Sequence, residues 1–130
     1  MTEKPDAAPG PATHHAPSPG SLDDLVCYFE GEWVPMRDAK VSIMTHAFMY
    51  GTATFEGIRA YWNADDRRLY GVKIREHVER IRQSCRILLM KHVPSVDELT
   101  RLIIDTIRRN DFPETAYTRP SFYPPTRSIA

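Results

Sequence analysis

The sequence predicts an α+β fold in which a mostly antiparallel sheet is flanked by two helices. Before residue 73, short segments of alternating polarity are separated by turn residues, which is typical of antiparallel hairpins. In residues 74–91 and 95–110, apolar residues recur at steps of three and four, which indicates amphipathic helices. Alternation returns over residues 115–123, where a last strand is expected.

Two hairpins are expected in the first half of the chain. The first turns at residues 30–32, where a glycine supplies the freedom of φ that a tight turn needs. The second turns at residues 63–66 and returns as a strand over residues 67–72. Between the hairpins, residues 41–44 are predicted to be extended and residues 47–50 to form one or two helical turns.

The first predicted helix has one apolar stripe and one arginine that lies well away from it. The stripe consists of Val78, Ile81, Cys85, Leu88 and Leu89. Arg80 falls near Ile87 and Met90 on another face, which favours a helix covered on both sides. A solvated arginine with two stray apolar neighbours explains the same pattern, so both interpretations stay open.

The second predicted helix begins at a capping box. Ser95 can accept a hydrogen bond from the backbone of residue 98, and the Glu98 side chain can reach back to residue 95. Its apolar stripe consists of Leu99, Leu102, Ile103 and Ile107. Asn110 and Pro113 are expected to end this helix.

The last strand places a phenol and a guanidinium side by side. Tyr117 and Arg119 share one face of the alternating segment. Pro120 cannot donate a backbone hydrogen bond, so this strand is expected at a sheet edge or to end at a bulge.

Composition limits the classes of function. The chain has 130 residues, 42% of them hydrophobic, and a formal net charge of zero, which argues against a nucleic-acid or anionic-membrane partner held by bulk charge. No apolar run is long enough to span a bilayer, and no secretory leader pattern is present. Cys27 and Cys85 have no metal-ligand spacing and are interpreted as small core residues in a reducing compartment. A cytoplasmic soluble protein without a metal site is therefore expected.

The chain divides into three parts. Residues 1–21 are rich in proline and are expected to be a disordered extension, in which the adjacent His14 and His15 lack the rigid geometry of a metal site. Residues 22–123 are expected to form the folded domain, and residues 124–130 an irregular tail.

One strand face carries an unusual combination of residues. Alternation from residue 54 places Phe55, Gly57 and Arg59 together, which suits a pocket wall: an aromatic ring, a bare backbone and a fixed positive charge. An edge strand whose arginine lies flat over a neighbouring ring explains the pattern equally well, and both possibilities stay open.

Six segments of the chain resemble the branched-chain aminotransferases, enzymes of fold type IV that use pyridoxal 5′-phosphate (PLP). The matching segments are Phe-Glu-Gly-Glu-Trp-Val at 29–34, Asp-Ala-Lys-Val at 38–41, His-Ala to Tyr-Gly-Thr at 46–52, Phe-Glu-Gly-Ile-Arg at 55–59, Arg-Glu-His-Val-Glu-Arg at 75–80 and Ala-Tyr-Thr-Arg-Pro at 116–120. The resemblance covers roughly residues 26 to 123 and implies the small N-terminal domain of this fold. It implies transamination of leucine, isoleucine or valine with 2-oxoglutarate.

The resemblance also implies roles for single residues. Arg80 would contact the phosphate of PLP, for which a planar cationic donor is well suited. Tyr50 would contribute to the pocket of a neighbouring subunit, which implies a homodimer or a larger homo-oligomer.

The remaining implied residues concern the substrate. Phe55 and Gly57 would line the pocket for a branched side chain, and Arg59 would support that wall. Tyr117 would bind near the substrate carboxylate. Arg119 would receive the distal carboxylate of glutamate, and it must lie at the rim because an aliphatic side chain wants no charge nearby.

No candidate catalytic residue is identified in the chain. PLP enzymes of this kind need a lysine that carries the cofactor as a Schiff base. The four lysines, Lys4, Lys40, Lys73 and Lys91, stand in polar surroundings. The resemblance places the required lysine in a second, larger domain, so a truncated product with little activity of its own is expected.

Two other classes of function stay open. A sheet with arginines and aromatic residues could bind a nucleotide or single-stranded RNA, although acidic residues are interleaved with the arginines. The chain could also be a regulatory dimerisation partner. If apolar surface was formed for a missing domain, exposed patches are expected around Tyr50, Phe55 and Tyr123.

Overall fold

The computed structural model describes residues 20–124. Its elements, in chain order, are η1 (Leu22–Asp24), β1 (Val26–Phe29), β2 (Glu32–Pro35), η2 (Met36–Asp38), α1 (His46–Tyr50), β3 (Thr54–Phe55), β4 (Ile58–Asn63), β5 (Arg68–Gly71), α2 (Ile74–Ile87), α3 (Val96–Asn110), β6 (Ala116–Thr118) and β7 (Ser121–Phe122). All strand pairs are antiparallel: β1 with β2, β3 with β7, and β4 with both β5 and β6. The predicted α+β fold is confirmed.

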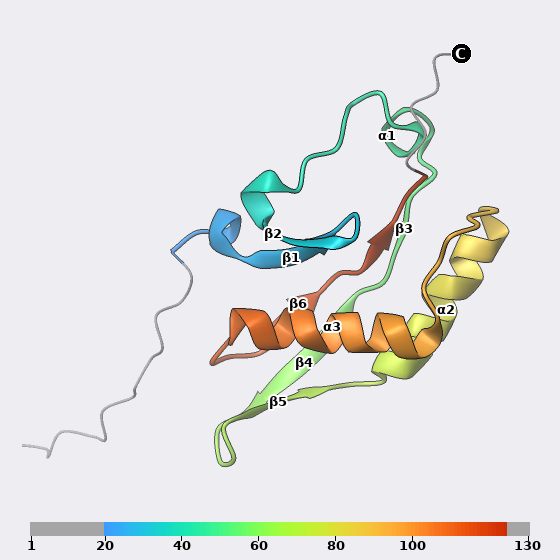
Figure 1. The fold of residues 1–130 in the computed structure, drawn as a ribbon. Helices are drawn as coiled ribbons and strands as arrows, with labels where there is room; N and C mark the ends of the chain where they lie inside the picture. The colour runs from blue at the N-terminus through green and yellow to red at the C-terminus, as the bar shows by residue number, and fades with distance from the viewer. Residues whose placement is uncertain (1–19, 125–130) are drawn as a thin grey trace, which may run out of the picture.

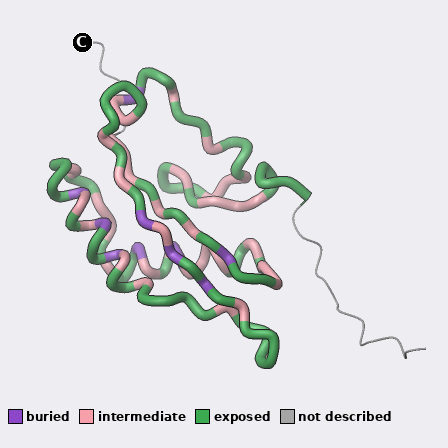
Figure 2. The backbone as a smooth tube through the Cα atoms, turned by 180° about the vertical axis from the view of Figure 1, so that it is seen from behind, coloured by how far each residue is buried: buried purple, intermediate pink, exposed green. Residues whose placement is uncertain are grey.

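Helices α2 and α3 lie on one face of the sheet β5-β4-β6 (Figure 1). Between the helices and the sheet lies the core, whose buried members are Ile58, Val78, Ile81, Cys85, Leu99 and Ile103. The other face of the sheet carries no helix among residues 20–124 (Figure 1). Buried and exposed residues alternate over the first half of β4, which Figure 2 shows from behind. Side chains on that face are therefore free to contact a ligand or another chain.

The strands β3–β4 and β6–β7 form one long antiparallel ribbon with a short interruption. Phe55 pairs with Ser121 before the interruption, and Ile58 pairs with Thr118 after it. The register does not slip between these pairs, so no bulge is present. The Glu56 N–H donates to the Pro120 carbonyl at 3.1 Å, but proline has no N–H to return the bond. Of the two alternatives predicted from Pro120, the sheet edge is confirmed, because β6 is an edge strand, and the single strand expected over 115–123 becomes two.

The first hairpin forms as predicted. Its turn residues Glu30 and Gly31 have φ values of 49° and 97°, so both adopt positive φ as a tight hairpin turn requires. The Asn110 side chain fastens this hairpin to the end of α3. Its Oδ1 accepts from the Val26 N–H at 2.8 Å, and its Nδ2 donates to the Val26 carbonyl at 2.9 Å.

Helix α2 ends four residues earlier than predicted. Leu89 has a φ of 56°, and the Met90 N–H donates back to the Cys85 carbonyl at 2.9 Å, which closes the helix end. Leu88 and Leu89 are exposed rather than part of the apolar stripe, and Ile87 is 72% exposed. Of the two interpretations left open for this face, a second covered side does not include Ile87, whereas Met90 is half-buried and packs against the core.

Helix α3 has the predicted capping box and end. Ser95 Oγ accepts from the Glu98 N–H at 3.2 Å, and the Glu98 carboxylate accepts from the Ser95 N–H at 3.3 Å. The helix ends at Asn110, and Asp111 follows with a φ of 44°.

Two further expectations are corrected. Residues 41–44 do not form a strand, because the Thr45 N–H donates to the Ser42 carbonyl at 3.0 Å and closes a turn. Tyr123 is half-buried rather than exposed, and its hydroxyl donates to Glu30 at 2.7 Å. Burial first, and then this hydrogen bond, raises the pKa of Tyr123 to about 12.

Among the described residues, no helix has both the length and the apolar character to cross a membrane. The expected extension and tail fall mostly on residues 1–19 and 125–130, outside the described part; His14, His15 and Lys4 lie there too.

Candidate functional site

The segment Glu56–Gly57 joins two arrangements on opposite faces of the ribbon. Glu56 points inward, with Ile58 and Ala60, and is 6% exposed. Phe55 and Arg59 point outward and are exposed. A buried carboxylate is costly unless it is paired, so its partners define the inner arrangement.

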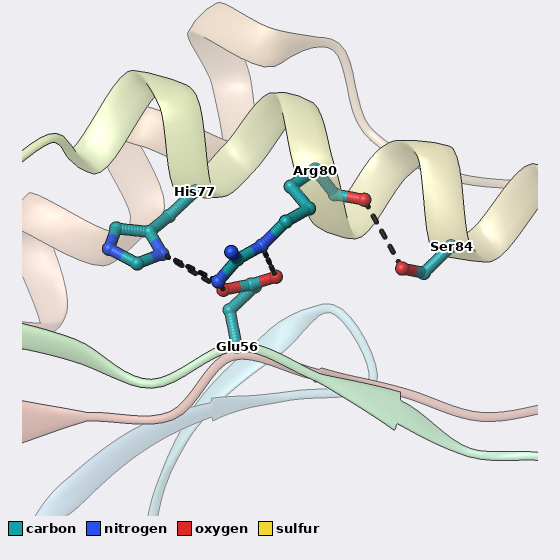
Figure 3. Close-up of polar contacts among 4 residues, drawn as sticks. All are labelled: Glu56, His77, Arg80 and Ser84. Atoms are coloured by element: carbon teal, nitrogen blue, oxygen red, sulfur yellow. Dashed lines mark hydrogen bonds and ion pairs between the residues drawn. The ribbon is translucent and has the colours of Figure 1, made fainter.

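The Glu56 carboxylate binds two side chains of α2 (Figure 3). Arg80 donates to it through Nε at 2.6 Å and through Nη2 at 2.5 Å. His77 Nδ1 lies 2.9 Å from the same carboxylate, which makes it a donor when that nitrogen carries the proton. Figure 3 also shows Ser84, whose hydroxyl donates to the Arg80 carbonyl at 3.3 Å and leaves the guanidinium untouched.

The charges of the pair stabilise each other. The Arg80 hydrogen bonds hold the pKa of the Glu56 carboxyl below its ordinary value; burial opposes them, and the His77 hydrogen bond adds to them. The same hydrogen bonds raise the pKa of Arg80. Glu56 is therefore ionised and Arg80 cationic at neutral pH.

An open hollow of about 280 Å³ lies beside this pair, lined by Lys73, Glu76, His77 and Arg80. The Arg80 side chain is 66% exposed while the Glu56 side chain is 7% exposed. A guanidinium has five N–H donors and the carboxylate uses two of them. Within residues 20–124, Nη1 donates no hydrogen bond. The hollow thus has a cationic donor group available to an anion.

The outer face brings together the other predicted ligand-binding residues. Tyr117 stands opposite Arg59 in the register, and its hydroxyl leans over Gly57. A Cβ at position 57 would lie 2.1 Å from this hydroxyl oxygen, so only glycine leaves room for it. The Arg119 guanidinium carbon lies 3.6 Å from the centre of the Phe55 ring. The prediction that these residues share a face is confirmed by the register.

The arginine that stacks on a ring is Arg119 and not Arg59. Stacking of this kind is worth about 0.5–1 kcal/mol at an exposed site. Because Phe55 stays 52% exposed beneath it, the pair forms an open rim rather than a closed wall. The alternative of an edge strand with Arg59 flat over a ring is therefore wrong, because β4 is the central strand of its sheet and the stacked arginine is Arg119. A pocket wall on this face stays a prediction.

Tyr50 lies apart from the outer face, on the short helix α1. It is 59% exposed, and neighbouring Phe48 and Met49 are exposed as well. The exposed apolar surface predicted around Tyr50 and Phe55 is confirmed. A pocket that includes Tyr50 stays a prediction.

No described lysine has the surroundings of a catalytic base. Lys40, Lys73 and Lys91 are all exposed. Only Lys73 lines the hollow, where it stands at the beginning of α2.

Arg80 and Tyr117 lie on opposite sides of the Glu56–Gly57 segment. Arg80 reaches the segment from α2, and Tyr117 covers it from β6. The hollow that Arg80 lines does not include Tyr117. A single cleft that holds both groups stays a prediction.

Glu56 and His77 were missed as members of the site. The signal for Glu56 was present, because alternation places this carboxylate on the same side as Ile58 and Ala60. A charged residue on an apolar strand face needs a partner, and Arg80 was a cation set apart from the apolar stripe of its helix.

Comparison with known proteins gives this geometry a context. No family model matches the chain. A probable branched-chain-amino-acid aminotransferase of Aquifex aeolicus is 45% identical over 96 residues, which are 74% of this chain and 31% of the relative. The branched-chain-amino-acid aminotransferase of Escherichia coli K12 is 40% identical over 96 residues, 74% of this chain and 30% of the relative.

Solved structures agree with the sequence relatives. The branched-chain aminotransferase of Thermoproteus uzoniensis, crystallised with norvaline, has a TM-score of 0.76 and 34% identity over 82% of this chain and 35% of that chain. The chain matches part of a branched-chain aminotransferase. The branched-chain amino acid aminotransferase of Thermobaculum terrenum, crystallised in its PLP form, has a TM-score of 0.71 and 29% identity over 79% of this chain and 34% of that chain.

The match with branched-chain aminotransferases covers most of this chain but only a small part of each relative. The chain spans about 30% of the length of the curated relatives that it matches.

Proposed function

We propose that the chain supplies the substrate face and one phosphate contact of a PLP-dependent branched-chain-amino-acid aminotransferase. The reaction transfers the amino group of leucine, isoleucine or valine to 2-oxoglutarate. The observation that supports this most strongly is the shared fold and sequence over about 80% of the chain, with Phe55, Gly57, Arg59, Tyr117 and Arg119 on one uncovered face.

The residues of the inner arrangement fit a cofactor phosphate. Arg80 offers an unused nitrogen, is largely exposed and lines a hollow with Lys73. Planar guanidinium donors match phosphate oxygens in geometry and charge. When bound, PLP supplies the electron withdrawal that labilises bonds at the amino acid α-carbon.

The outer face fits two kinds of substrate end. The Phe55 ring and the bare backbone of Gly57 offer apolar contact for a branched side chain. The Arg119 guanidinium lies over the Phe55 ring at the exposed rim, so it can meet a carboxylate while the aliphatic part stays on the ring. Tyr117 has a hydroxyl beside this surface that can donate to a substrate carboxylate.

We propose that none of the described lysines carries the cofactor, which is supported by the exposure of Lys40, Lys73 and Lys91. We propose that the 130-residue chain alone turns over substrate poorly. The exposed apolar side chains of α1, Tyr50 among them, support contact with a second copy in a homodimer or larger homo-oligomer. The two free cysteines support a reducing, cytoplasmic compartment.

An NMR titration of the labelled chain tests the substrate face. 4-Methylvaleric acid should shift the backbone signals of Phe55 and Gly57, and 2-oxoglutarate should shift Arg119 as well. Tyr117→Phe should weaken both ligands, whereas Tyr61→Phe, on the same sheet face further along β4, should weaken neither. Shifts that avoid these residues, or equal effects of the two variants, would contradict the proposal.

A turnover assay tests the statement about the lysine. The chain is mixed with PLP, leucine and 2-oxoglutarate, and the branched 2-oxo acid is measured against PLP alone. We expect no excess over the protein-free control. Robust turnover by the chain would show that one of its own lysines carries the cofactor, which would contradict the proposal.

A further inference from the structure

The packing of the core does not require a carboxylate at position 56. Its neighbours along the strand on the same side, Ile58 and Ala60, are 0% and 1% exposed and pack in the core. An apolar residue at position 56 would cost nothing in desolvation. The carboxylate instead reaches α2 and takes both the Nε and the Nη2 hydrogen of Arg80.

This contact determines how the guanidinium is oriented. Two parallel hydrogen bonds from one edge of a planar group fix both its position and its plane. Of the remaining three N–H directions, the second hydrogen of Nη2 lies on the side of His77, whose Nδ1 is 3.5 Å from Nη2, so the two hydrogens of Nη1 are the ones without a protein partner among residues 20–124. Figure 3 shows Nη1 on the side of the guanidinium away from the carboxylate. His77 holds the carboxylate from a second direction, at 2.9 Å, so the acceptor itself is fixed.

We propose that Glu56 is a positioning residue, which holds Arg80 by its Nε–Nη2 edge so that the opposite side presents preoriented donors to a phosphate. The inference rests on the proposed function of Arg80 and adds the residue that makes the contact specific. An arginine held in this way has already lost its rotamer freedom before the ligand arrives, which strengthens binding.

The carboxylate also has a competing effect. It neutralises the charge of Arg80, which lowers the attraction for an anion. An interaction across about 6 Å in a water-exposed site changes affinity by about threefold. Loss of preorientation for one long side chain weakens binding by about three- to tenfold. A variant without the carboxylate would change both the charge near Arg80 and the orientation of Arg80. The decisive variant therefore keeps the negative charge and has a shorter side chain.

Glu56→Asp meets this condition, because it keeps the carboxylate and removes one methylene. The probe is pyridoxamine 5′-phosphate, which has no aldehyde to react with exposed lysines. Its dissociation constant is measured by calorimetry for the unmodified chain, Glu56→Asp, Arg80→Lys and the control Glu79→Asp. Glu79 lies on the same helix, is exposed and bridges Arg75 at 3.5 Å.

A second readout reports on Arg80 itself. Nitrogen-15 NMR of the arginine side chains shows separate Nη1 and Nη2 signals when rotation of the guanidinium is hindered. We expect separate signals for Arg80 in the unmodified chain and merged signals in Glu56→Asp. The measurement on the unmodified chain alone keeps the proposal testable if Glu56→Asp does not fold.

The expected result is an affinity weaker by about three- to tenfold for Glu56→Asp, by at least about tenfold for Arg80→Lys, and unchanged for Glu79→Asp. Hindered Arg80 signals that persist in Glu56→Asp, or merged signals in the unmodified chain, would overturn the positioning role alone. If the unmodified chain and Arg80→Lys bind pyridoxamine 5′-phosphate equally, or if neither binds it, the proposed contact between Arg80 and the phosphate is overturned. The positioning role of Glu56 would then be overturned as well.

Discussion

Replacement of Gly57 or Gly71 by alanine compares the exposed outer face with the core, because each new Cβ would meet a side chain in only one of these two places. A Cβ at Gly57 would meet the Tyr117 hydroxyl at 2.1 Å, and a Cβ at Gly71 would meet Ile74 Cδ1 at 2.3 Å. Neither glycine has a positive φ, so alanine introduces no backbone strain at either position. The two clashes are alike in distance and differ in the freedom of the neighbour to move.

The neighbours set the magnitudes. Tyr117 is 60% exposed, so its tip can move outward from 2.1 to the ordinary contact distance of 3.4 Å, a shift of about 1.3 Å, at a cost within about 0.5 kcal/mol. Ile74 packs against the core, where overpacking costs about 1–3 kcal/mol. The entropy that alanine removes from the unfolded chain is common to both variants and cancels in their difference.

Urea denaturation of the 130-residue chain measures the difference. With a slope of about 1.5 kcal/mol per molar urea, Gly71→Ala should unfold at a midpoint at least about 0.3 M below that of Gly57→Ala. The Tyr117 ring signals should shift in Gly57→Ala and stay unchanged in Gly71→Ala. Equal midpoints, or an unmoved Tyr117 ring in Gly57→Ala, would refute the reasoning.

Three further predictions concern the frame of the site. Asn110→Ala should lower the free energy of unfolding by about 1–3 kcal/mol, measured in urea, because Val26 loses both of its bonds to the side chain; Asp65→Ala, in the exposed turn between β4 and β5, should change it by less than about 0.5 kcal/mol. Ser95→Ala should cost about 1 kcal/mol through loss of the α3 cap, and a loss as small as that of Asp65→Ala would contradict this. Tyr123 has a pKa raised from 10.0 to about 12, so the stability that it contributes is complete below pH 10 and is lost as the pH rises through 12. Between pH 10 and 12, the free energy of unfolding should therefore fall less for Tyr123→Phe than for the unmodified chain. If the two free energies fall in parallel with pH, the raised pKa of Tyr123 is contradicted.

Periodicity in the sequence predicted which residues share a face. Because side chains alternate strictly along a strand, Phe55, Gly57 and Arg59 had to point one way, and the same rule placed Tyr117 with Arg119. Pro120 was informative for a different reason, since a missing N–H removes a ladder bond in any sheet.

Contacts between distant segments could not be predicted in this way. The bond between Glu56 and Arg80 joins residues 24 positions apart, and local pattern carries no information about that distance. The end of α2 was missed because Leu89 adopts a positive φ where glycine or asparagine would have signalled it. Tyr123 was expected to be exposed because its partner Glu30 lies 93 positions away.

The adjacency of Glu56 and Gly57 has a mechanical consequence. Their Cα atoms are separated by one peptide unit of about 3.8 Å, which is planar and stiff. The anchor of Arg80 and the backbone beneath the Tyr117 phenol are therefore parts of one stiff link. A displacement of the Glu56 backbone must also move Gly57, so the two opposite faces of the ribbon move together at this point.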